Sequence, residues 1–147
     1  MRYFHEWLNN SGFDRVDVIH WNNGLWDLLH VVGDERVFTP LGFYLDTIER
    51  VYLQMRKLCP QAKIIFATNT YVIEDAHPET LIRYNREIEE YNLAVVKKLE
   101  SLGVEINDLG AITKDIAPSM HSDWVHYGEE GSKVLAAAVT EKIERYI

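Results

Sequence analysis

The sequence places an aspartate three residues before a histidine, in the segment Asp123-Trp124-Val125-His126. A carboxylate at this spacing in a turn can hydrogen-bond an imidazole, fix its tautomer and stabilise the imidazolium that forms on protonation. These residue types therefore predict a general base, His126, oriented by Asp123. A structural interpretation stays open, in which Asp123 caps the following helix and His126 is a surface residue.

The same segment offers a donor set that a metal could use. His121, Asp123 and His126 supply two imidazoles and one carboxylate close together in the sequence. A closed site needs a fourth ligand, and no other His or Cys pair has ligand-like spacing. Proton transfer is therefore the preferred interpretation, and we expect neither a metal nor a cofactor.

A second group of polar residues, Asn22, Asn23 and Gly24, directly follows the apolar segment VDVIHW. Amide side chains and glycine N–H groups at the rim of a sheet can donate hydrogen bonds to a developing oxyanion. Asn-Gly is also a good turn former, so a purely structural role is the alternative.

A nucleophile for such a site is difficult to find. No serine lies in a G-x-S-x-G pattern or directly after an expected strand. Cys59 precedes Pro60 at the end of an expected helix, where we expect it to be inert. The serines concerned are Ser11, Ser101, Ser119, Ser122 and Ser132. The sequence thus predicts a general base without a nucleophile.

The elements that must position these residues alternate between strands and helices. Short β-branched or apolar runs predict strands at 16–21, 63–68 and 104–107. Apolar residues at three- and four-residue steps predict long helices at 40–58, 80–102 and 129–146. Thr39-Pro40 predicts a capped helix start, and residues 1–9 predict a further helix. This alternation is typical of an α/β fold with a parallel sheet, although three strands make a thin one.

Length and composition set the outer limits. The 147 residues, without repeats or linkers, predict a single domain spanning 1–147. A formal net charge of −8 without a basic patch argues against nucleic acid as a partner. No apolar stretch approaches the roughly 20 residues of a membrane span, and one cysteine makes a cytoplasmic setting the default.

The segments VIHWNNGLWDL and DWVHYGEEGSKVLAAAV resemble motifs of the SGNH hydrolases, the GDSL-like esterase superfamily. The last block of that family is D-x-x-H, which matches Asp123 and His126. Its third block is G-x-N-D, which here is Gly24-Leu25-Trp26-Asp27. Trp26 stands at the position of the family's oxyanion asparagine, so that role is assigned to Asn22, as in the variant block N-x-G-L-x-D, with Asn23 as the fallback.

The resemblance implies a flavodoxin-like, three-layer α/β/α fold and hydrolysis of carboxylic esters by a Ser-His-Asp mechanism without a metal. The substrate would be a small-molecule ester, such as an acyl or acetyl ester of a carbohydrate or lipid. In this assignment His126 is the general base and Asp123 its orienter.

The family's G-D-S block, which supplies the serine, is absent from the sequence. The resemblance covers nearly all of the chain but only the later part of the family domain. We therefore expect the first strand, first helix and second strand of that fold to be missing. This chain is then expected to have little or no esterase activity.

Two further hypotheses remain. The same rim could form a non-catalytic module that binds a carbohydrate or acyl group on the aromatic residues Trp21, Trp26, Trp124 and Tyr127. An exposed edge of the thin sheet could also pair with a second copy, giving a homo-oligomer.

Overall fold

The computed structural model describes Glu6, residues 15–32 and residues 34–147. Apart from Glu6, the helix expected at residues 1–9 lies outside the described residues. In the described part of the chain, no helix combines the length and apolar character needed to cross a bilayer.

Three parallel strands form the central sheet. They are β1 (Val18–Asn22), β3 (Lys63–Ala67) and β5 (Glu105–Asn107), in the order β1-β3-β5. Asn22 lies opposite Ala67, and Ala67 lies opposite Asn107. The carboxyl ends of the three strands therefore meet at one edge, where ligands of open α/β sheets usually bind.

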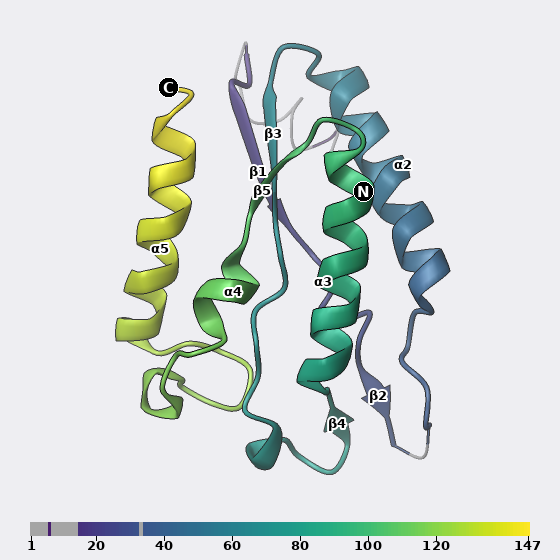
Figure 1. Ribbon diagram of the computed structural model, residues 1–147, viewed down its shortest axis with the longest axis vertical. Helices are drawn as coiled ribbons and strands as arrows, with labels where there is room; N and C mark the ends of the chain where they lie inside the picture. The colour runs from purple at the N-terminus through teal and green to yellow at the C-terminus, as the bar shows by residue number, and fades with distance from the viewer. Residues whose placement is uncertain (1–5, 7–14, 33) are drawn as a thin grey trace.

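Helices cover both faces of this sheet. Helices α2 (Leu41–Leu58) and α3 (Asn85–Glu100) contact each other on one side, and α5 (Glu129–Glu144) packs against β1 and β5 on the other (Figure 1). A short helix, α4 (Leu109–Thr113), follows β5. The expected three-layer α/β/α fold with a parallel sheet is confirmed.

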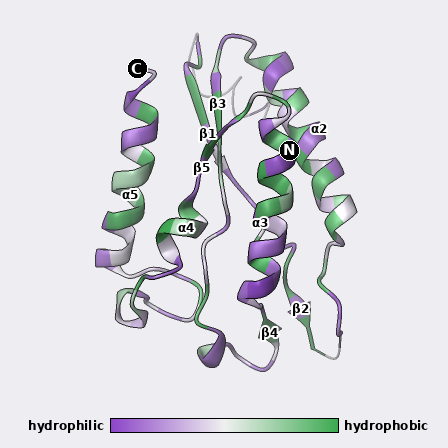
Figure 2. Cartoon of the chain, in the orientation of Figure 1, coloured by the Kyte–Doolittle hydropathy of each residue, from purple (hydrophilic) through white to green (hydrophobic). Residues whose placement is uncertain are grey.

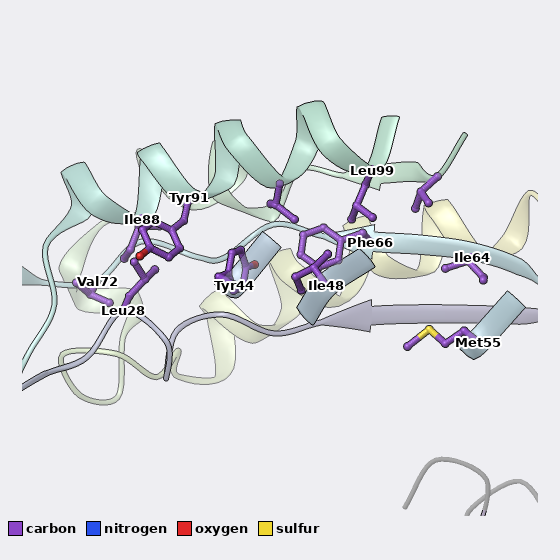
Figure 3. Packing of buried hydrophobic residues seen from close by; sticks show 12 residues of the cluster. Leu28, Tyr44, Ile48, Met55, Ile64, Phe66, Val72, Ile88, Tyr91 and Leu99 are labelled. Atoms are coloured by element: carbon purple, nitrogen blue, oxygen red, sulfur yellow. The ribbon is translucent and has the colours of Figure 1, made fainter. Parts of the chain in front are cut away.

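The main core lies between the sheet and helices α2 and α3. All three long helices carry hydrophilic and hydrophobic residues along their length, so each can turn an apolar side inward (Figure 2). Figure 3 shows side chains of the buried cluster beside helix α3 and strand β3. The cluster consists of Leu28, Tyr44, Ile48, Met55, Ile64, Phe66, Val72, Ile88, Tyr91, Val95, Leu99 and Val104.

The expected helix at 80–102 was wrong at its beginning, because the structure starts α3 at Asn85. Leu81–Ile82 form a short strand, β4, that pairs antiparallel with β2 (His30–Val31). The apolar periodicity does run back to Leu81, but strand pairing takes those backbone groups instead.

The start of α2 also differs from the expectation. Pro40 occupies the capping position, and no side chain donates or accepts a capping hydrogen bond there. The backbone N–H of Thr39 instead donates to the carbonyl of Asp27 at 2.9 Å. Thr39 thus ties the helix start to the loop that follows β1.

Helix α5 buries less of its surface than its apolar residues suggest. Only Gly131 of this helix is classed as buried, and Val134 is 40% exposed. A Cβ at Gly131 would lie 2.6 Å from the carbonyl oxygen of Met120, so glycine permits a close approach there. This contact holds the start of α5 against the segment that precedes it.

Candidate active site

The loop between η2 (Pro118–Met120) and α5 is closed by backbone hydrogen bonds. His121 and Tyr127 form an isolated antiparallel bridge. The Ser122 N–H donates to the carbonyl of His126 at 2.9 Å, and the Gly128 N–H donates to that of Met120 at 2.8 Å. The loop therefore holds Asp123 and His126 in a tight turn.

Within this turn the two side chains form the pair that their spacing predicts. Asp123 Oδ2 lies 2.7 Å from His126 Nδ1, and Asp123 Oδ1 accepts from the N–H groups of Val125 and His126, both at 2.7 Å. The hydrogen bond from the His126 side chain, followed by the two backbone donors, lowers the pKa of Asp123 to about 2. The carboxylate is therefore ionised across the neutral range.

This geometry also assigns the proton on the imidazole. A carboxylate only accepts hydrogen bonds, so Nδ1 of neutral His126 carries the proton and Nε2 keeps its lone pair. The His126 side chain is 75% exposed. The capping interpretation of Asp123 was wrong, because Gly128 occupies the capping position of α5 and no side chain makes a capping hydrogen bond there.

Two contacts place this loop at the carboxyl edge of the sheet. The Ile73 N–H donates to the carbonyl of Trp124 at 2.8 Å, and the Tyr127 hydroxyl donates to that of Tyr71 at 2.7 Å. Both partners lie in the segment that follows β3. The chain therefore brings His126 to the edge where the loop after β1 also lies.

A cavity of about 520 Å³ opens beside the pair. It collects residues from the loop after β1, the segment after β3, strand β4, the loop that carries the pair and helix α5. Its volume falls within the range of small-molecule sites. Its lining residues are Leu25, Trp26, Thr70, Leu81, Arg83, Asp123, Trp124, Val125, His126, Tyr127, Ser132 and Leu135.

The residues of the Asn22–Gly24 turn do not line this cavity, although the next residue, Leu25, does. The side-chain amide of Asn22 donates to the carbonyls of Ala67 at 2.8 Å and Thr68 at 3.1 Å, so both its N–H groups are engaged. Asn23 Nδ2 donates no hydrogen bond within the described residues. Of the two side-chain amides, only that of Asn23 therefore has N–H groups that make no hydrogen bond within the described residues.

Gly24 is required where it stands. Its φ is +144°, and a Cβ there would lie 2.4 Å from Asn69 Nδ2. Asn69 is itself fixed, since its backbone N–H donates to Asn92 Oδ1 at 2.9 Å and its carbonyl accepts from Asn92 Nδ2 at 2.8 Å. The loop after β1 therefore packs directly on the segment after β3, which sets the positions of Leu25 and Trp26.

The serine hydroxyls of the described residues are not placed to attack a substrate beside His126. Ser122 Oγ donates to the carbonyl of His126, and Ser132 Oγ donates to that of Tyr127. Ser101 Oγ donates to Lys98 at a helix end. Among the described residues, no serine hydroxyl bonds to the His126 ring. Ser11 lies outside them.

Two further histidines, His121 and His20, have structural surroundings. His121 stacks on Tyr127 with ring centroids 4.2 Å apart, and burial lowers its pKa. Within the described chain no three His, Cys, Asp or Glu residues gather as a metal site would require. His20 Nε2 lies 3.1 Å from Asn107 Nδ2, within hydrogen-bond distance.

Of the four aromatic residues expected at the rim, Trp26, Trp124 and Tyr127 line the cavity. Trp21 instead packs edge-on against Phe66 at a centroid distance of 5.0 Å, in the core. The residue that sequence reasoning missed is Arg83, which also lines the cavity. It falls inside the helix expected at 80–102, and no motif marks it.

No model of a known protein family matches the chain, and no curated protein matches it. Solved structures do. A GDSL-like lipase from Bacteroides thetaiotaomicron matches 98% of this chain at a TM-score of 0.72 and 18% identity. An acetylxylan esterase from Geobacillus stearothermophilus matches 97% of it at a TM-score of 0.63 and 20% identity.

These structures are longer than this chain. The chain spans 68% of the lipase, 66% of the esterase and 59% of a further similar structure from Streptococcus pneumonia, which has a TM-score of 0.71 and 19% identity. At these identities the likeness shows a shared fold.

Proposed function

We propose that the chain is an SGNH-type hydrolase domain that acts on carboxylic esters, with His126 as general base and Asp123 as its orienter. The 2.7 Å contact between Asp123 Oδ2 and His126 Nδ1 carries this proposal, because it fixes the tautomer that a base needs. The fold shared with a lipase and an esterase supports the reaction class.

In this mechanism His126 Nε2 takes the proton of an attacking hydroxyl as its oxygen bonds to the ester carbonyl carbon. Asp123 stabilises the imidazolium that results. The carbon–oxygen bond to the leaving alcohol then breaks, and His126 returns the proton to that alcohol. Water releases the acyl group by the same steps, and a base of this kind contributes roughly 10²–10⁴-fold to the rate.

The tetrahedral intermediate needs hydrogen-bond donors for its oxyanion. We assign this role to the Asn22–Gly24 turn, which does not itself line the cavity but directly precedes Leu25, which does. Because the amide of Asn22 already donates to two carbonyls, Asn23 is the preferred side chain of the two. We assign the backbone N–H groups of the Gly24 region as further donors to the oxyanion.

We assign the nucleophile to a serine that is missing from this 147-residue chain. One solved structure of the Geobacillus esterase is described as a catalytic mutant in which a serine is replaced by alanine. Three of the four described serines, Ser101, Ser122 and Ser132, donate to backbone carbonyls instead. We therefore expect the 147-residue chain alone to hydrolyse esters at a rate close to that of buffer.

An added alcohol can test the base independently of the serine. Methanol in the cavity would attack 4-nitrophenyl acetate, its proton passing to His126 while methyl acetate and 4-nitrophenolate form. We expect methanol to raise 4-nitrophenolate release about tenfold or more over the His126→Ala variant, a small part of what general bases contribute. His77→Ala, a histidine that packs on Trp124 without contacting Asp123, is the matched control.

A non-catalytic binding module is the second candidate. It is favoured by Trp26, which lines the cavity while remaining 72% exposed, as aromatic platforms for sugars do. An acetylated oligosaccharide would then bind equally to wild type and His126→Ala. Under this alternative neither protein would show a methanol-dependent reaction.

A further inference from the structure

Arg83 is a buried cation in the wall of the cavity. The residue is 4% exposed, and its guanidinium lies between two indole rings, 5.3 Å from the centroid of Trp26 and 5.1 Å from that of Trp124. Its Nε donates to the carbonyl of Leu25. These three contacts hold the planar group in one orientation.

The two terminal amino groups of Arg83 have no comparable partner. Within the described residues they donate no hydrogen bond, and no carboxylate forms an ion pair with them. Among the described residues, the enclosed side-chain polar atoms that lack a partner belong to Asn23, Asn69 and His121, so the terminal nitrogens of Arg83 are not fully enclosed, and Arg83 lines the cavity. A buried charge without a counter-charge is costly, which indicates that a ligand supplies one.

Among the described residues that line the cavity, Asp123 is the only acidic one. Both oxygens of its carboxylate are taken by His126 and the backbone N–H groups, and it forms no ion pair with Arg83. Burial lowers the pKa of Arg83, with no opposing carboxylate to raise it. A guanidinium nonetheless stays charged at neutral pH.

We propose that this cavity binds esters that carry an anionic group, a carboxylate or a phosphate, which Arg83 holds through its two terminal amino groups. Two parallel N–H donors match the two oxygens of such a group. The indoles of Trp26 and Trp124 would then flank the ligand chain between the anion and the ester. That the ligand is an ester rests on the proposed hydrolase function, whereas the anion site rests on the surroundings of Arg83.

Binding tests the anion site without requiring turnover. Monomethyl succinate carries one ester and one carboxylate, whereas dimethyl succinate is its neutral counterpart. We expect NMR titrations of the Trp26 and Trp124 indole signals to show about tenfold tighter binding of the anionic ester. Inorganic phosphate is the second probe. It should compete with monomethyl succinate for the site if the site accepts phosphate, and should not compete if the site is selective for carboxylates.

Variants separate this role from a structural one. Arg83→Gln should remove the preference for the anionic ester, and Arg83→Lys should restore part of it. Lys114→Gln removes the same charge from a lysine paired with Glu89 outside the cavity, and should leave the preference within about twofold.

Equal binding of both esters to the wild type, or an undiminished preference in a folded Arg83→Gln, would overturn the proposal. The wild-type comparison decides the matter even if Arg83→Gln does not fold. Loss of the methanol reaction together with retained anion preference would reject the hydrolase function and leave the anion site in place.

Discussion

At the scale of single residues, the two oxygens of Asp123 have separate tasks. Oδ1 accepts two backbone N–H groups and closes the turn, whereas Oδ2 binds His126 Nδ1. Removing the carboxylate charge therefore weakens the turn and frees the imidazole together. The same hydrogen bonds lower the pKa of Asp123 to about 2 from its ordinary 3.8.

A pH dependence follows from that lowered pKa. A carboxylate with a depressed folded-state pKa contributes stability that is fully present above 3.8 and lost as pH falls toward 2. We expect the difference in unfolding free energy between wild type and Asp123→Asn to be constant above about pH 5 and to shrink towards pH 2. Urea unfolding at several pH values measures it, with Ser122→Ala as the control from the same turn.

A difference that stays unchanged between pH 5 and pH 2 would contradict this account of Asp123. The turn would then be held by backbone bonds alone. Such a result would also weaken the argument that the carboxylate positions His126.

The pair was predictable from spacing because all its contacts are local, within four consecutive residues. The surroundings of Arg83 were not predictable. They depend on Trp26, Trp124 and Leu25, which are distant in the sequence and meet only once the loops after β1 and before α5 are in place. The engagement of the Asn22 amide by Ala67 and Thr68 was hidden for the same reason.

At the scale of elements, the strands β1, β3 and β5 and the helices α2 and α5 were predicted nearly where they lie, because apolar periodicity reports burial directly. The error at 80–84 arose where a helical pattern continues into a segment that pairs with β2 instead. Local propensity cannot show such a competing tertiary partner.

Asn92 illustrates how an element supports the site. From α3 its side chain binds the N–H and the carbonyl of Asn69, a residue with no exposed surface. We expect Asn92→Ala to lower the unfolding free energy by about 2–4 kcal/mol, because buried backbone groups lose their partners. Leu93→Ala, at a neighbouring exposed position, should change it by less than about 0.5 kcal/mol.

Chemical denaturation of the two α3 variants supplies the comparison. If Asn92→Ala proved no more destabilising than Leu93→Ala, Asn69 would not depend on α3 for its position. The packing of Gly24 on Asn69 would then need another explanation.

At the scale of the whole molecule, β1 pairs only with β3, so within the described part of the chain its other side is an unpaired edge. Unpaired N–H and C=O groups along a strand favour addition of another strand. We expect a homodimer through this edge, with twice the 17.1 kDa mass of one chain in size-exclusion chromatography with light scattering. A clean monomer at low micromolar concentration would count against it.

The overall architecture was predictable from the alternation of strands and helices, including the thinness of the sheet. How completely each helix covers the sheet was not predictable. Helix α5 leaves Val134 exposed and buries little beyond Gly131. Amphipathic patterning marks the inward side of a helix but does not show how much surface its neighbours cover.

The most direct test of the whole account is 4-nitrophenolate release from 4-nitrophenyl acetate in methanol-containing buffer, compared between wild type and His126→Ala. The account predicts that the methanol-dependent rate of the wild type is about tenfold higher than that of His126→Ala. His77→Ala should retain the wild-type rate. Equal methanol-dependent rates in all three proteins would contradict it, since His126 would then not act as a base.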